Sequence, residues 1–162
     1  MKNKKSHTVF TSFLEALEVK HTDDFSNGYF NEHPHKYNLF GISKMLSDYG
    51  IENAGTRIAD KEQDLFNIEC PFIAHIGSDF VVVYKIEPDK VHYLWNGKKI
   101  SLSVSEFVKT WTGVVLLAET TTRSIEPDYG SRIWEARGME RKNAVAGNAY
   151  SFGKWVQVAG HL

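Results

Sequence analysis

The sequence predicts an α+β fold in which helices come first and an antiparallel sheet follows. Two observations lead to this prediction. Apolar residues recur at helical spacing before residue 51, and the period changes to that of strands near residue 70. The later apolar runs are joined by short links rich in turn-forming residues, which favour antiparallel neighbours. A chain of 162 residues falls in the size range of a single domain and can bury a core.

Two helices are expected in the first 50 residues. Apolar side chains of residues 9–17 share one face, and Thr8 or Ser6 can cap this helix. The stretch 20–36 is rich in Asp, Asn, Gly and Pro, so we expect a loop there. A second apolar stripe predicts a helix over residues 38–49, which the glycine that follows would end.

Shorter elements and strands make up the middle of the chain. A short strand is expected at 56–59 and a short helix at 62–66. Ser103 and Glu106 form a capping-box signature for a helix that runs to Trp111. The expected sheet, against which the helix 38–49 packs centrally, consists of residues 71–76, 79–86, 91–95 and 114–118.

Composition excludes several classes of function. A net charge of −1 gives no electrostatic basis for binding nucleic acid or an anionic membrane. The single cysteine, Cys70, excludes an internal disulfide framework and a Cys-x-x-Cys metal site. No apolar run approaches the roughly 20 residues that span a bilayer. The N-terminal segment lacks an uninterrupted apolar core and a small-residue cleavage site, so we expect no signal peptide. No cofactor is expected.

Three stretches together resemble one known family. They are NEHPHKYNLFGISKMLSDYG (31–50), PFIAHIGSDFVVVYKI (71–86) and KVHYLWNGKKISLSVSEFVKTWTGVVLLAE (90–119). Their order and spacing resemble the C39 family of papain-like cysteine peptidases, which trim leader peptides after a double glycine. The resemblance implies a papain-like fold for a domain of residues 1–119.

The same resemblance implies that the catalytic residues are missing. By the family's spacing, the nucleophile position falls on Tyr37 and the oxyanion-hole glutamine near Asn31. The place of the catalytic histidine holds Asp79, and that of the orienting aspartate lies near Trp95 and Asn96. A tyrosine phenol is a poor substitute for a thiolate, so we expect Tyr37 to fill the volume of the former cleft. The domain is therefore predicted to be a degenerate peptidase.

Other residues could support a displaced active site or a metal site. Cys70 lies at the entry to a buried strand and is expected to be structural, because free cysteines are usually buried. His75 is expected to be a hydrogen-bonded strand residue, although an open cleft with Cys70 or His75 would allow a displaced peptidase site. His33 and His35 do not complete a tetrahedral ligand set, so we expect no metal.

Aromatic residues are the expected anchors of a binding groove. Tyr29 and Phe30 would join Tyr37 and Trp95 around the former substrate cleft, with Asp79 beside them. The alternative interpretation of the same aromatic residues is that they belong to the core, and this is the stronger expectation for Trp111.

The leading functional prediction is a degenerate C39-like domain that binds a peptide or polypeptide as an accessory part of a bacterial export or membrane system. The implied partners are a leader peptide and a membrane transporter or oxidoreductase module. Nucleic acid is excluded as a partner. The expected location is the cytoplasm, free or as the soluble part of a membrane-associated protein. Two alternatives stay open: an active cysteine peptidase with a displaced site, and a soluble domain related to quinone-linked membrane thiol-oxidoreductase fusions.

Residues 120–162 form a tail that is not covered by the resemblance. The tail holds five glycines and no sustained period. Family chains often run on into membrane modules at this point, so we interpret the tail as a truncated or an altered junction. Residues 154–158 alternate weakly and are a candidate strand.

Overall fold

The larger of two compact units carries all the strands of the structure. A computed structural model describes residues 7–138, and the chain divides into Met1–Ile125 and Glu126–Leu162. The candidate strand 154–158 lies outside the described residues. In the second unit, one helix is described, α6 (Tyr129–Ala136). The predicted boundary between a domain 1–119 and its tail stays a prediction.

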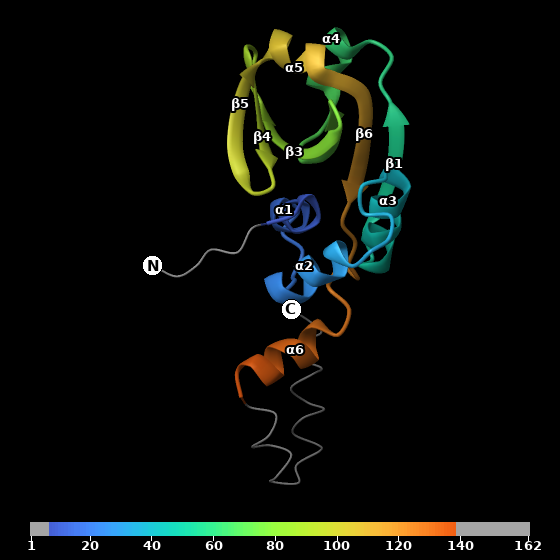
Figure 1. Ribbon diagram of the computed structural model, residues 1–162, viewed down its shortest axis with the longest axis vertical. Coiled ribbons are helices and arrows are strands. Elements are labelled where there is room, and N and C mark those ends of the chain that lie inside the picture. The colour runs from blue at the N-terminus through green and yellow to red at the C-terminus, as the bar shows by residue number, and fades with distance from the viewer. Residues whose placement is uncertain (1–6, 139–162) are drawn as a thin grey trace. The chain divides into compact units, whose positions relative to one another are not determined.

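A curved sheet of six strands forms the framework of the first unit (Figure 1). Every neighbouring pair is antiparallel, as predicted. At the β4–β5 turn, Asn96 and Gly97 have φ angles of 50° and 86°, as a two-residue type I′ hairpin turn requires. In sheet order the strands are β1 (Glu52–Arg57), β6 (Trp111–Glu119), β2 (Phe72–Ile76), β3 (Asp79–Ile86), β4 (Lys90–Trp95) and β5 (Lys98–Ser103).

Side-chain caps define where the first and third helices begin, and the cap of the first is the predicted Thr8. Thr8 accepts a hydrogen bond from the Thr11 N–H and forms a capping box with it at the start of α1 (Val9–Ala16). The Asn38 side chain accepts from the Phe40 N–H over 2.7 Å and begins α3 (Leu39–Asp48). The remaining helices of this unit are α2 (Asp23–Asn31), α4 (Lys61–Asp64), the 3₁₀ turn η1 (Leu65–Asn67) and α5 (Val104–Thr110).

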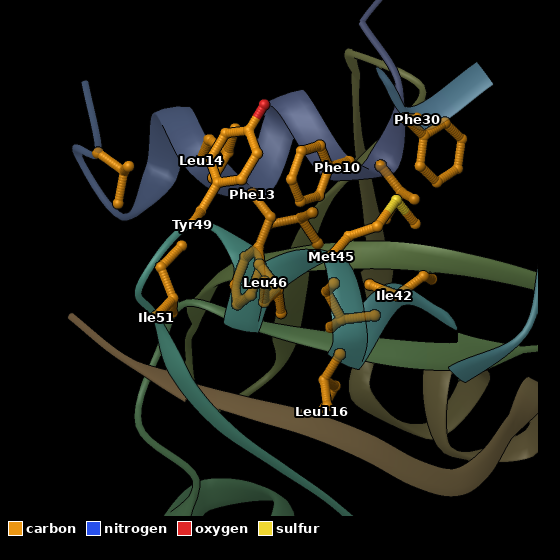
Figure 2. Close-up of a cluster of buried hydrophobic side chains, with 14 residues drawn as sticks. Phe10, Phe13, Leu14, Phe30, Ile42, Met45, Leu46, Tyr49, Ile51 and Leu116 are labelled. Atoms are coloured by element: carbon orange, nitrogen blue, oxygen red, sulfur yellow. The ribbon is translucent and has the colours of Figure 1, made fainter. Parts of the chain in front are cut away.

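One core lies between the N-terminal helices and the sheet. Met45 and Leu46 on α3 are fully buried, which confirms that this helix packs centrally. Figure 2 shows their side chains between α1 and the strands, with Phe10 above them and Leu116 of β6 below. Ile73 and Val82 complete this core from β2 and β3.

A second core, which was not predicted, fills the opposite face of the sheet. The strand residues next to those of the first core point to this side, because side chains alternate along a strand. Phe72 and Val83 meet Phe107 of α5 and Trp111 here, and all four are buried. Trp111 is therefore a core residue, as expected. Burial of both faces explains why β2 and β3 have continuous apolar runs.

Residues 20–36 are not all loop, and that part of the prediction was wrong. Nine of them form α2, whose first turn carries Asp23 and Asp24. Acidic side chains there interact favourably with the helix dipole. Phe25 and Tyr29 lie four residues apart and stack with ring centroids 6.2 Å apart, and Phe30 is buried in the first core. Aromatic spacing therefore outweighs the turn-forming composition.

The strand limits also differ from the prediction at the edges of the sheet. β1 covers residues 52–57 instead of 56–59, and β5 was not predicted. β1 is mostly exposed and pairs along its whole length with β6. Its position is therefore set by backbone pairing with β6, and an apolar pattern in the sequence could not predict it. β6 begins at Trp111, three residues before the predicted strand.

Candidate functional site

A groove of about 450 Å³ collects the four positions that the family spacing predicted to be those of catalytic residues. The start of α1, the end of α2, the loop before α3 and the nearby ends of β3 and β4 form its walls. Its lining residues are Thr8, Val9, Phe30, Asn31, Lys36, Tyr37, Ser78, Asp79, Phe80, Trp95 and Asn96.

Each of the four family positions lies at the end of an element. Asn31 is the last residue of α2, and Tyr37 directly precedes the cap of α3. Asp79 begins β3, and Trp95 ends β4. Because β3 and β4 are antiparallel neighbours, these two residues lie at the same end of the hairpin. The fold thus brings Asn31, Tyr37, Asp79 and Trp95 to one groove.

A hydrogen bond joins Asp79 and Trp95, the two positions predicted to take the places of the family's histidine and aspartate. The Trp95 indole Nε1–H donates to Asp79 Oδ2 over 3.3 Å. The carboxylate thus stands at the histidine position and the N–H donor at the aspartate position, the reverse of the arrangement that the resemblance implies for an active peptidase.

Tyr37 does not fill the groove, and that prediction was wrong. Its side chain is 78% exposed, beside the Lys36 ammonium, which lies 5.3 Å from the ring centroid. The loop that carries Tyr37 packs tightly on α3. The contact is so close that a Cβ added at Gly41 would clash with the carbonyl of His35. Backbone packing of this loop therefore leaves the phenol at the rim.

Phe30 and Tyr29, the two other predicted groove residues, differ in position. Phe30 lines the groove and is buried. Tyr29 is not among the lining residues, because its hydroxyl donates to Asp48 Oδ2 over 2.6 Å on α3. Burial and the Asp48 carboxylate both raise the pKa of Tyr29. Adjacent residues on a helix point about 100° apart, which separates the two rings.

Cys70 and His75 do not form a displaced catalytic pair. Neither lines the groove. Cys70 packs against the second core, whereas the His75 ring lies 4.8 Å from the ring of Phe80, which packs against the first core. Burial raises the pKa of the Cys70 thiol, which disfavours the reactive thiolate. His75 Nδ1 lies 3.0 Å from Thr112 Oγ1, which confirms the expected hydrogen-bonded strand histidine.

The histidine pair of the α2–α3 loop forms a local contact. His33 Nδ1 accepts a hydrogen bond from the His35 N–H over 3.1 Å, and the ring centroids are 6.1 Å apart. Within residues 7–138, no group of three or more His, Cys, Asp or Glu side chains is arranged to hold a metal ion. In the same residues, no helix combines the length and apolar character needed to cross a membrane.

Comparison with known proteins identifies the family. Residues 28–123, more than half of the chain, match the family model of the Peptidase C39 family. The chain belongs to the peptidase C39 family. This C39 domain is also 37% identical over 83 residues to the Lactococcin-G-processing and transport ATP-binding protein LagD of Lactococcus lactis subsp. lactis. The match covers 48% of the chain and 12% of that relative, so the chain spans only a small part of its length.

Solved structures of C39 domains confirm the α+β, papain-like fold. A double glycine motif protease from an AMS/PCAT transporter, in complex with its leader peptide, superposes with a TM-score of 0.61 at 19% identity, over 75% of this chain and 89% of that one. The peptidase domain of Streptococcus ComA, a bi-functional ABC transporter, gives 0.59 at 16% identity, over 70% and 88%. A C39-like domain of a toxin secretion ATP-binding protein from Vibrio parahaemolyticus gives 0.53 at 14%, over 72% and 100%.

Sequence reasoning missed part of the lining of the groove. Ser78 and Phe80 stand on either side of the predicted site residue Asp79, so adjacency could have identified them. Lys36 directly precedes Tyr37, so adjacency to a predicted site residue could have identified it as well. Thr8 and Val9 come from the start of α1, and no motif links that helix to the later stretches. Only the fold brings them to the groove.

Proposed function

We propose that this C39 domain is catalytically degenerate and binds a peptide without cleaving it. The observation that carries the proposal is the groove around Tyr37, Asp79 and Trp95. The family spacing supports the interpretation of this groove as the former peptidase cleft, and the chemistry of these three side chains supports the loss of catalysis. The domain would therefore recognise a peptide or leader peptide and leave it intact.

Each missing role has its own chemical reason. The phenol of Tyr37 lacks the nucleophilicity of a thiolate. The carboxylate of Asp79 cannot become the cation that stabilises a thiolate and later protonates a leaving amine. The indole of Trp95 is a neutral donor and cannot orient an imidazolium as an anion does. Asn31 retains an amide at the position of the oxyanion-hole glutamine, which would support binding more than catalysis.

The relatives support the context of the proposal. LagD is named as a processing and transport ATP-binding protein, and one structural relative was solved with a leader peptide. By analogy, the domain would serve an export or membrane system as an accessory module. The positions of Cys70 and His75, which pack against different cores and lie outside the groove, give no support to the displaced peptidase. No contact described above favours the thiol-oxidoreductase alternative.

Titration with a synthetic double-glycine leader peptide tests the proposal. Binding is followed in ¹H–¹⁵N NMR spectra through the indole N–H signal of Trp95, which is assigned by its loss in Trp95→Phe. We expect this signal to shift on binding, and Tyr37→Ala to weaken the affinity about tenfold, in the range of an exposed aromatic anchor.

Phe66→Ala is the matched control for that titration. Phe66 is also an exposed aromatic, 48% accessible, and it does not line the groove. It should leave the affinity unchanged. A shift of the Trp95 signal that neither variant alters, or the absence of any shift at saturating peptide, would contradict binding in this groove.

A further inference from the structure

Asp79 puts a negative charge at the rim of the groove, and this charge is not neutralised. The side chain is exposed, and its hydrogen-bond donor is the neutral indole of Trp95. Within the described residues, no Lys, Arg or His nitrogen lies within salt-bridge distance of this carboxylate. The indole occupies one lone pair of Oδ2, so Oδ1 and the remaining lone pairs are available to a ligand.

Two aromatic rings beside Asp79 already attract cations. The ammonium of Lys98 lies 5.8 Å from the ring centroid of Trp95, and that of Lys36 lies 5.3 Å from the centroid of Tyr37. Both distances are within the range of cation–π attraction. Trp95 is 37% exposed and Tyr37 is 78% exposed, so ring surface is accessible from the groove.

Lys36, the lysine that lines the groove, is held by Asn31 and not by Asp79. Its ammonium donates a hydrogen bond of 2.7 Å to the carbonyl oxygen of Asn31 at the end of α2. It therefore serves that helix end, where a positive charge is favourable, and forms no ion pair with Asp79. A carboxylate next to two electron-rich rings remains, which is the usual composition of a receptor for an organic cation.

We propose that this groove holds a lysine or arginine side chain of its peptide ligand. The ammonium or guanidinium would pair with Asp79, and its aliphatic stem would lie on Trp95 and Tyr37. This inference rests on the proposed peptide binding and adds the chemical class that the groove selects. Selection of a cationic side chain differs from recognition of a neutral glycine pair, because removal of the Asp79 carboxylate would remove only the preference for the cation.

Three capped heptapeptides that differ only at their central residue test the inference. That residue is lysine, norleucine or glutamate in an otherwise glycine and alanine sequence, so stem length is matched between the first two. Titration of the full chain is followed through the Trp95 indole signal in 20 mM salt. We expect the lysine peptide to bind about tenfold tighter than the norleucine peptide, and the glutamate peptide to bind weakest. The difference should shrink in 0.5 M salt, because Asp79 is exposed.

Asp79→Asn and the control Asp89→Asn identify the group responsible. Both variants remove one exposed carboxylate, and Asp89 lies in the β3–β4 turn, away from the groove. Asp79→Asn should equalise the lysine and norleucine peptides, whereas Asp89→Asn should preserve the preference. Equal binding of both peptides to the unaltered chain, tighter binding of the glutamate peptide, or no shift with any of the three would overturn the inference. A leader peptide that still binds in those cases would leave the proposed function standing.

Discussion

Leu46→Ala tests whether α3 is the central element that holds the groove in place. Leu46 is fully buried between α1 and the sheet (Figure 2). Truncation of a fully buried leucine removes its burial energy and leaves a cavity, which costs roughly 3–4 kcal/mol at such a site. Alanine is the best helix former, so helix propensity cannot account for any loss. For a chain of this size the melting temperature should fall by roughly 6–15 °C.

The assay is urea unfolding of the full chain, followed by circular dichroism, with Leu117→Ala as the control. Leu117 is a leucine of β6 that is 36% exposed, so its truncation should cost less than about 1 kcal/mol. Equal losses in the two variants, or a loss below about 1 kcal/mol for Leu46→Ala, would refute the central packing of α3.

Three further predictions concern a cap, the thiol and metals. Asn38→Ala removes the acceptor of the Phe40 N–H and should cost about 1 kcal/mol in the same unfolding assay, while Asn38→Asp should retain most of the stability. Burial raises the pKa of the Cys70 thiol, so the stability contributed by the buried neutral thiol is present below the pKa of the unfolded chain and is lost as pH rises through the folded pKa. Alkylation of Cys70 at pH 8 should be much slower in the folded chain than in urea. Equal alkylation rates would contradict this prediction. Elemental analysis should find no stoichiometric zinc, and one equivalent that is lost in a His33→Ala His35→Ala variant would overturn the prediction.

The elements that were predicted correctly are those whose apolar residues are spaced to face the core. The stripe that includes Met45 and Leu46 predicts α3, because a helix buried on one face must repeat apolar residues every three to four positions. β3 was predicted with its observed limits and β2 to within one residue, since both faces of these strands are buried. β5 was missed because it is an edge strand, and edge strands commonly carry charged residues that weaken the apolar pattern. In β5, Lys98 and Lys99 precede Ile100 and Leu102, which are only partly buried.

Most of the groove residues that were predicted correctly are those at positions given by the spacing of the family motifs. Asn31, Tyr37, Asp79 and Trp95 came from the resemblance, and the structure places all four around one groove. Spacing says nothing about the direction of a side chain. It therefore gave Tyr29 a place in the groove that its hydrogen bond to α3 excludes, and it gave Tyr37 a filling role that its exposure contradicts.

Cleavage of a double-glycine leader peptide by the purified chain tests the central claim most directly. Mass spectrometry over a long incubation should show intact peptide, with Tyr37→Cys also inactive because Asp79 cannot activate the new thiol; Tyr37→Cys with Asp79→His is the minimum change that could restore turnover. An intact peptide that still binds agrees with a degenerate C39 domain. Cleavage at the double glycine by the unaltered chain, abolished both by a thiol alkylator and by Cys70→Ala, would contradict it.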